Sequence, residues 1–318
     1  MMVLMRAKMM RQVKLTVSVG VGMSSVTRGL LVAGVVLSLS GAGVWVDFAQ
    51  SSQSREHEAP QYLPGIASAV SSRHALVLPP PGATFDYQLG GPYRPAPGTR
   101  IVTRDRSDPP VAGTYNICYI NAFQTQPQES SWWKTHKPDL ILRDGSGRYI
   151  QDPGWPGEYL LDTSTADKRA RLATIVGGWV DGCAGSGYQA VEADNLDSWT
   201  RSKGMLGRAG NVAFVKVLTT WVHRDRLAFG QKNTPELASQ SRSLGFDFAV
   251  AEECHAYTEC GAYTAVYGQR VLNVEYTDNG GTAAFHRACK DDHTRMSMVL
   301  RDRNLTIPSD LKYVHQLC

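Results

Sequence analysis

Residues 189–197 read Gln-Ala-Val-Glu-Ala-Asp-Asn-Leu-Asp, a short apolar run that ends in acidic and amide side chains. The same form recurs in three later stretches, 229–233, 246–255 and 271–278. Each stretch is typical of a β-strand whose C-terminal end carries polar residues. Because the C-terminal ends of the strands hold the active site in a (β/α)-barrel, the four stretches predict one mouth. The residues expected around that mouth are Asp194, Lys232, Glu252 and Glu275.

Strand and helix patterns alternate along the second half of the chain, which indicates a parallel sheet covered by helices. We therefore expect an α/β fold, a (β/α)8 TIM-like barrel in a single catalytic domain, with a doubly wound open sheet as the alternative. The first half is irregular, because the connection over 104–113 is too short for a crossover helix. The candidate helices are 165–180, 212–223, 235–244 and 283–290. The candidate strands, two more than a barrel needs, are 85–89, 100–103, 115–121, 140–143, 159–162, 189–194, 227–231, 246–252, 271–276 and 296–300.

Residues 1–50 are typical of an export signal. A basic start is followed by the uncharged run 29–46, GLLVAGVVLSLSGAGVWV, which suits a signal of this kind. A cleaved signal is preferred over a retained N-terminal anchor, and Met23 is an alternative start. Residues 51–80 show little periodicity and are expected to form a flexible lead-in, so that the barrel occupies 81–318. The protein is therefore expected to be secreted and extracellular, with no stable membrane association after cleavage.

Charge argues against a nucleic-acid partner. The whole chain carries 33 Lys and Arg against 29 Asp and Glu, a net charge of +4. Residues 1–50 hold five of those basic side chains and one of the acids, so the remaining residues carry 28 of each sign. The basic surplus that is typical of nucleic-acid binders therefore belongs to the export segment alone.

The six cysteines all lie in the predicted barrel region. An even number behind an export signal predicts three disulfides. Close spacing favours the first expected pair and the position of the last cysteine favours the second, which leaves the third by elimination. The pairs are Cys254–Cys260, Cys289–Cys318 and Cys118–Cys183. His255 and Glu259 lie within the first pair and are metal-ligand types, but no second cluster accompanies them, so neither a metal nor a cofactor is expected.

Paired carboxylates at strand ends suit hydrolysis of a glycosidic bond. One protonated carboxyl donates a proton to the leaving oxygen, and one ionised carboxylate acts as nucleophile or base. Two acids close together in a partly buried mouth have their pKa values pushed apart, which supplies both states. Strand alternation puts Glu252 in an inward row with Phe248 and Val250. It favours Glu252 over Glu253, and Asp194 lies nearest the mouth on its own strand. The alternative, that such acids cap the following helices, explains single acids better than a succession of them.

Six segments resemble glycoside hydrolase family 114, the endo-α-1,4-polygalactosaminidase-like proteins. Together they run in order from about residue 85 to 278, and the Glu-x-Asp-Asn and Glu-x-Cys…Glu-Cys blocks are the more specific of them. The stretch from Asp105 to Gly113 departs from the family pattern, which has a longer helix-bearing stretch there. The segments are Asn116-Ile-Cys-Tyr-Ile-Asn121, Trp155-Pro-Gly-Glu-Tyr-Leu-Leu-Asp162, Val191-Glu-Ala-Asp194-Asn-Leu-Asp197, Gln231-Lys-Asn233, Ala251-Glu252-Glu-Cys254 to Glu259-Cys260 and Val274-Glu-Tyr276.

The resemblance implies a (β/α)-barrel that hydrolyses α-1,4-linked galactosamine chains without a metal. It implies Asp194 as nucleophile and Glu252 as acid/base. Galactosamine polymers are cationic when deacetylated, so an acidic mouth is expected to attract this polysaccharide. A non-catalytic carbohydrate-binding barrel and a hydrolase of another α-glycan are the alternatives, and a monomer is expected. The residues expected to bind substrate are Tyr119, Glu192, Asn195, Asp197, Lys232, Asn233, Glu275 and Tyr276.

Overall fold

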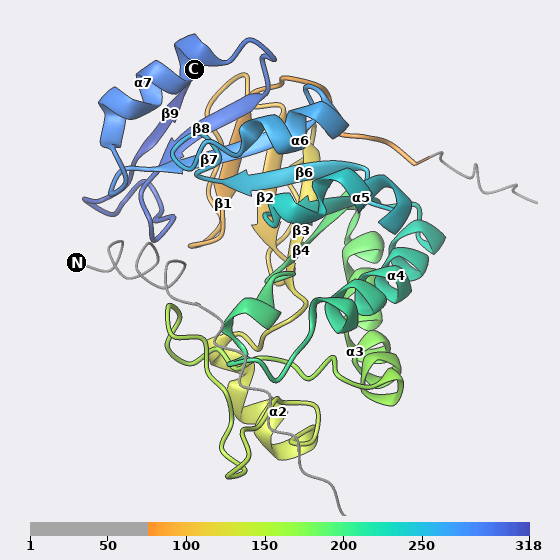
Figure 1. The fold of residues 1–318 in the computed structure, drawn as a ribbon. Coiled ribbons are helices and arrows are strands. Elements are labelled where there is room, and N and C mark those ends of the chain that lie inside the picture. Colours follow the sequence, from red (N-terminus) through yellow and green to blue (C-terminus); the bar gives the residue numbers. More distant parts are fainter. Residues whose placement is uncertain (1–75) are drawn as a thin grey trace, which may run out of the picture. The chain divides into compact units, whose positions relative to one another are not determined.

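The computed structural model of the protein describes residues 76–318. The expectations for residues 1–50 and for most of 51–80 lie outside the described residues. Eight parallel strands follow one another in chain order around the sheet, and a ninth pairs antiparallel with the eighth (Figure 1). The predicted TIM-like barrel is therefore confirmed, in an almost closed form. The strands are β1 (Phe85–Gln88), β2 (Ile101–Asp105), β3 (Tyr115–Asn121), β4 (Ala190–Asp194), β5 (Ala228–Lys232), β6 (Phe248–Glu252), β7 (Val271–Tyr276), β8 (Ser297–Arg301) and β9 (His315–Leu317).

Helices separate the strands of the second half and lie outside the sheet (Figure 1). The longest of them, α3, begins after Thr165, whose side chain accepts a hydrogen bond from the Lys168 backbone N–H. It ends at Gly187, where φ is 92°, a left-handed conformation that glycine adopts without strain. The helix therefore ends at Ser186 rather than at residue 180, the end predicted from the sequence. The helices are α2 (Ser130–His136), α3 (Ala166–Ser186), α4 (Arg208–Arg224), α5 (Ala238–Leu244), α6 (Cys260–Tyr267) and α7 (Gly281–Asp291), with 3-10 turns η1 (Pro127–Glu129), η2 (Ser198–Arg201) and η3 (Pro235–Leu237).

The connection from β3 to α3 differs from the sequence prediction. The runs 140–143 and 159–162, predicted as strands, do not join the barrel. One isolated antiparallel bridge, Ile141 to Leu161, joins the two runs, and other isolated bridges pair them with Gln124, Tyr149 and Gln151. Both runs bury apolar side chains in the core cluster outside the barrel interior, so their patterns look like those of barrel strands although they lie outside the barrel sheet. Strand β9 was not predicted, because three residues are too few to show a period.

A side chain, rather than a backbone ladder, bridges the two ends of the parallel sheet. Arg301 of β8 is fully buried, donates a hydrogen bond to the Tyr87 carbonyl of β1, and lies 3.5 Å from Asp86 Oδ1. No ladder joins β1 to β8 within residues 76–318. The connections from β1 to β2 and from β2 to β3 contain no helix in this part of the chain, and the short spacing over 104–113 predicts this for the second of them.

Alternate residues of each strand fill the barrel interior. On β6, Phe248 and Val250 belong to the interior cluster, and Gly230 of β5 lies directly against the Phe248 ring. Because side chains alternate along a strand, these same rows end in polar residues at the C-terminal edge. Glu252 follows Val250 and Lys232 follows Gly230, so the predicted inward row on β6 is confirmed.

The residues just before β1 also contact the barrel. Leu76 and Leu78 pack against the interior cluster, and the Val77 carbonyl accepts a hydrogen bond of 2.7 Å from the Tyr115 hydroxyl. The packed body therefore includes residues 76–80, which the sequence had assigned to a flexible lead-in.

Three disulfides cross-link elements of the barrel. The first joins β3 to α3, the second closes the loop before α6, and the third joins α7 to the residue after β9. The pairs are those expected from the sequence: Cys118–Cys183, Cys254–Cys260 and Cys289–Cys318. None of the helices formed by residues 76–318 is long and apolar enough to cross a membrane.

Candidate active site

Lys232 lies at the centre of the polar residues at the C-terminal edge of the barrel. Its side chain is only 2% exposed, and its Nζ lies 3.1 Å from Glu192 Oε1, 3.2 Å from Asp194 Oδ2 and 3.4 Å from Glu252 Oε2. Burial disfavours the ammonium, but the three carboxylates outweigh burial and hold the pKa of Lys232 well above its ordinary value. A permanent positive charge is therefore buried among three acids from β4 and β6.

Asp194 is the last residue of β4 and remains partly open to solvent. Its side chain is 18% exposed. Oδ2 accepts a hydrogen bond of 2.8 Å from the Tyr119 hydroxyl, and Oδ1 accepts one of 2.6 Å from the Asn195 backbone N–H. Together with Lys232, these donors hold the carboxylate in one orientation.

Glu252 is the last residue of β6, and its side chain is 27% exposed. Oε1 accepts a hydrogen bond of 2.5 Å from the Tyr276 hydroxyl, and Oε2 accepts one of 3.0 Å from Asn233 Nδ2. Burial raises the pKa of Glu252, but the Lys232 charge and these two hydrogen bonds outweigh burial and hold the pKa below its ordinary value. Glu252 is therefore an ionised group before substrate arrives.

Glu192 lies one inward position below Asp194 and is fully buried. The Tyr87 hydroxyl donates a hydrogen bond of 2.7 Å to Oε1 and accepts one of 3.0 Å from Lys232 Nζ. Burial raises the pKa of Glu192 to about 7, although Lys232 opposes the shift. Glu192, which was predicted to bind substrate, and Tyr87 therefore support Lys232 from inside the barrel and do not line the open mouth.

Three consecutive strands leave the mouth through the same backbone conformation. Asn195, Asn233 and Glu253 directly follow β4, β5 and β6, and their φ angles are 64°, 46° and 59°. Only glycine, and less readily asparagine and aspartate, adopts this left-handed region without a marked cost. Such strained residues cluster at functional sites. Here they turn the chain away immediately after Asp194, Lys232 and Glu252.

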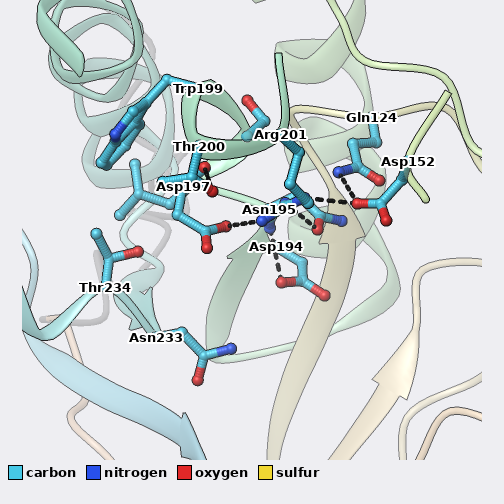
Figure 2. Close-up of polar contacts among 12 residues, drawn as sticks. Gln124, Asp152, Asp194, Asn195, Asp197, Trp199, Thr200, Arg201, Asn233 and Thr234 are labelled. Atoms are coloured by element: carbon cyan, nitrogen blue, oxygen red, sulfur yellow. Dashed lines mark hydrogen bonds and ion pairs between the residues drawn. The ribbon is translucent and has the colours of Figure 1, made fainter. Parts of the chain in front are cut away.

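Arg201 in η2 forms the wall beside Asp194. Its guanidinium lies 2.5 Å from Asp152 Oδ2, and it donates hydrogen bonds of 2.8 Å to Asp197 Oδ1 and 3.0 Å to Asn195 Oδ1. Figure 2 shows Arg201 between these three side chains, with Gln124 donating to Asp152 from the other side. The β3–α3 connection, which carries Asp152, is thereby tied to the residue that follows Asp194.

Arg303 forms the opposite wall, behind Glu252. Both of its terminal nitrogens donate to the Glu253 carboxylate, at 3.0 and 2.6 Å. The same guanidinium donates to Asp278 and lies 4.0 Å from the centre of the Tyr276 ring. It therefore fixes the phenol that donates to Glu252.

Comparison with known proteins gives this arrangement a family. Residues 66–318 match the glycoside-hydrolase family GH114. The chain belongs to this family. GH114 membership makes the protein a glycoside hydrolase, and it agrees with a barrel that carries paired carboxylates at its C-terminal edge.

Two solved structures resemble the GH114 chain in fold. One is Ega3 of Aspergillus fumigatus in complex with galactosamine, with a TM-score of 0.61, 22% identity, and coverage of 77% of this chain and 98% of Ega3. The other is the glycoside hydrolase domain of PelA from Pseudomonas aeruginosa, with a TM-score of 0.51, 12% identity, and coverage of 75% and 100%. No curated protein matches the sequence.

Most of the residues predicted for the GH114 site come together, and one does not. Glu275 lies on the face of β7 opposite to Tyr276 and is 5% exposed. Its Oε1 accepts hydrogen bonds from Asn273 Nδ2 and the His255 backbone N–H. The prediction that Glu275 lines the mouth was therefore wrong, because alternation turns it away from the barrel interior. The predicted residues that the structure gathers around Lys232 or on the adjoining wall are Tyr119, Glu192, Asp194, Asn195, Asp197, Asn233, Glu252 and Tyr276.

Sequence reasoning missed four residues of the site. Tyr87 occupies the inward row of the first strand, where alternation with Phe85 could have indicated it. Glu158, Arg201 and Arg303 lie in connections rather than strands, and no periodic pattern points to them. Glu158 belongs to the site because it accepts a hydrogen bond from Asn121, which pairs with Asp194. Within residues 76–318, no group of three or more His, Cys, Asp and Glu side chains is arranged to hold a metal ion.

Proposed function

We propose that this GH114 hydrolase is an exported, endo-acting enzyme that cleaves α-1,4-linked galactosamine-containing polysaccharide with Asp194 and Glu252. The observation that carries the proposal is the position of the Lys232 ammonium, 3.2 Å from Asp194 Oδ2 and 3.4 Å from Glu252 Oε2. It brings two partly exposed carboxylates from separate strands to one point of the mouth. Hydrolysis of a glycosidic bond needs such a pair.

The distances of the two carboxylates from Lys232 are compatible with a double-displacement reaction. Two oxygens that lie 3.2 and 3.4 Å from one nitrogen are no farther apart than the sum of those distances. Carboxyl groups about 5–5.5 Å apart are typical of retaining enzymes, and about 6.5–9.5 Å of inverting ones. This upper bound covers the retaining separation and only the shortest inverting one, so the proposal adopts the retaining reaction.

In the proposed reaction, an Asp194 oxygen attacks the anomeric carbon while the bond to the leaving oxygen breaks. Glu252 gives its proton to that oxygen, which leaves as the free hydroxyl of the shortened chain. Glu252 then takes a proton from water, and the resulting hydroxide oxygen displaces Asp194 from the anomeric carbon. The Tyr119 hydroxyl and the Asn195 N–H stabilise Asp194 each time it leaves as an anion.

Glu252 needs a proton for the first step, although its pKa is low in the free protein. Bound substrate raises this pKa. A sugar over the mouth removes the remaining solvent from Glu252, and desolvation disfavours the charged carboxylate. The proton therefore enters with the substrate rather than before it, so that Glu252 is neutral only when a leaving oxygen is beside it.

The amino sugar is supported by chemistry and by the comparisons. Three carboxylates surround a single ammonium in the cluster, so the mouth favours a cation, and deacetylated galactosamine carries one. The solved structure of Ega3 contains galactosamine. Export is supported by residues 1–50 and by the three disulfides, which persist in oxidising compartments.

The proposal is tested by incubating the protein with deacetylated and N-acetylated galactosamine polymers and following product lengths by mass spectrometry. Asp194→Asn and Glu252→Gln are each expected to keep the fold and to lower turnover by at least about a hundredfold, the usual range for loss of an acid or base. Asp181→Asn, an exposed carboxylate on α3, is the matched control and is expected to cleave normally.

Three results would contradict parts of the proposal. Binding without new chain ends would support a non-catalytic carbohydrate-binding barrel. Cleavage only of another α-glycan would keep the reaction and change the sugar. Near-normal turnover by either active-site variant would remove that residue from the mechanism. Accumulation of a sugar adduct on Glu252→Gln, seen in the intact mass, would assign Asp194 as the nucleophile.

A further inference from the structure

Glu158 is a carboxylate beside Asp194 that the proposed chemistry does not use. It lies in the β3–α3 connection and is half-buried. Its Oε2 accepts a hydrogen bond of 3.0 Å from Asn121 Nδ2. Asn121 ends β3, pairs in register with Asp194, and accepts a hydrogen bond of 2.9 Å from Asn195 Nδ2. A single amide therefore separates Glu158 from the end of β4.

Glu158 differs from its acidic neighbours because no cation of residues 76–318 lies within ion-pair distance of it. Asp194 and Glu252 share Lys232, while Asp152 pairs with Arg201. Glu253 and Asp278 pair with Arg303 in the same way. Its carboxylate instead accepts a hydrogen bond from the neutral side-chain amide of Asn121.

This environment makes the Glu158 charge costly when the site is empty. Burial raises the pKa of Glu158 to about 7, and the charges of Asp194 and Asp152 add to the shift. The Asn121 hydrogen bond and, less strongly, the charge of Arg201 oppose it. A half-buried carboxylate among other acids gains most from a cation that arrives from outside. The anionic form of Glu158 is therefore one that a cationic ligand would stabilise.

The position of Glu158 is fixed relative to the proposed nucleophile. Asp152 belongs to the same connection, and Arg201 ties it to Asn195, directly after Asp194 (Figure 2). Around the mouth, Glu158 approaches Asp194 from the β3 side, whereas Lys232 and Glu252 lie on the β5 and β6 side. A sugar seated against Asp194 would therefore have Glu252 on one side and Glu158 on the other.

We propose that Glu158 binds the ammonium group of the galactosamine unit seated against Asp194, and that this contact makes the enzyme prefer the free amine to the N-acetylated sugar. The inference rests on the proposed function and adds its specificity-determining residue. An ammonium gives Glu158 a charged hydrogen bond, the strong kind. An acetamide is neutral and bulkier, so it leaves the carboxylate uncompensated in a half-buried position.

The test measures binding, so that it does not depend on turnover. Calorimetry compares short galactosamine oligomers with their N-acetylated counterparts on Glu252→Gln protein, with and without Glu158→Gln. The amide keeps the shape of Glu158 and removes its charge. The Kd for the deacetylated oligomer is expected to rise about tenfold to a hundredfold, the usual worth of a hydrogen bond to a charged group. The Kd for the acetylated oligomer is expected to change less than about twofold.

Equal weakening for both oligomers, or no weakening for either, would overturn the role of Glu158. Asp181→Asn in the same background is the control for loss of a distant negative charge. Failure of the proposed function looks different: wild-type protein would cleave neither polymer, or Glu252→Gln would still cleave, whatever the binding experiment shows. Thermal melting of each variant checks that the fold is kept.

Discussion

The Tyr276 hydroxyl lies 2.5 Å from Oε1 of Glu252 and donates a hydrogen bond to it. Tyr276 is almost completely buried at the end of β7, and the Arg303 guanidinium lies 4.0 Å from its ring centre. The phenol is thus held in place from behind. A neighbouring strand therefore helps to set the protonation of the proposed acid.

Tyr276→Phe is expected to move the alkaline limb of the kcat/KM profile to higher pH. The hydrogen bond stabilises the charged form of Glu252 and contributes to its lowered pKa, so its loss raises that pKa. A proton donor with a higher pKa stays protonated to higher pH, and kcat/KM reports the free enzyme. The measurement is kcat/KM against pH for both proteins. Tyr149→Phe, in the β3–α3 connection, is the control, and an unmoved limb in Tyr276→Phe would disprove the coupling.

Glu192→Gln is expected to become more stable than the wild type as the pH rises. The folded pKa of Glu192 is raised from its ordinary 4.5 to about 7, so the unfolded chain loses its proton first and wild-type stability falls between those values. The amide has no charge to bury, and its oxygen can still accept from Tyr87 and Lys232. From pH 4 to pH 8, the unfolding free energy of Glu192→Gln should rise relative to that of the wild type by an amount on the order of 3 kcal/mol.

Thermal or urea unfolding of both proteins at both pH values measures this change. Glu236→Gln is the matched control, because Glu236 is an exposed acid at the start of η3, and its effect should be the same at both pH values. A Glu192→Gln protein that loses stability equally at pH 4 and pH 8 would show that the carboxylate is held by its neighbours without a net cost.

Strand alternation predicts which of the acids at the strand ends face the barrel interior. It favours Glu252 over Glu253, and in the structure Glu253 is buried and pairs with the partly exposed Arg303. The same rule places Glu275 with Asn273 on the outer face of β7, opposite to Val274 and Tyr276. The position of Glu275 at a strand end suggested the mouth, but a strand end has two faces and only one of them is inward.

The remaining parts of the site depend on contacts that no local pattern records. The β3–α3 connection forms bridges of its own, so its segments 140–143 and 159–162 look like strands. Glu158 lies between these segments, where the sequence shows no hydrophobic period. Arg201 reaches Asp152, 49 positions earlier in the chain, through a guanidinium whose direction depends on the whole fold. Likewise, Tyr87 and Lys232 meet only because the barrel brings their strands to one interior.

Gly230→Ala is expected to destabilise the protein by about 1–3 kcal/mol, the usual cost of overpacking a core. A Cβ at Gly230 would lie 2.7 Å from Cζ and 2.9 Å from Cε2 of the Phe248 ring, so the ring has to move. Lys232 follows on the same inward row, and a moderate loss of turnover is expected with it. Urea unfolding measures the cost, and Phe248→Leu should relieve it in the double variant.

Gly182→Ala provides the opposite control, because an added Cβ there meets nothing within 4 Å on α3. It should stabilise the protein by about 0.5–1 kcal/mol through helix propensity. If Gly230→Ala is as harmless as Gly182→Ala, the Phe248 ring is not confined by the barrel interior.

Removing the Cys118–Cys183 disulfide should lower stability without altering the chemistry. The two cysteines are 65 residues apart in the chain, and both are buried. Closing a loop of that length stabilises the folded state by about 4 kcal/mol in the chain-entropy model. Cys118 alternates with the inward Ile117 and Tyr119 of β3, so its sulfur faces α3 rather than the mouth. Replacing both cysteines by alanine should therefore lower the melting temperature while kcat at low temperature stays near that of the wild type.

Removing the Cys289–Cys318 pair, whose cysteines are 29 residues apart, should cost about 0.7 kcal/mol less by the same argument. A large fall in kcat for the first double variant, with the protein still folded, would mean that the disulfide positions Tyr119 against Asp194 as well as stabilising the barrel.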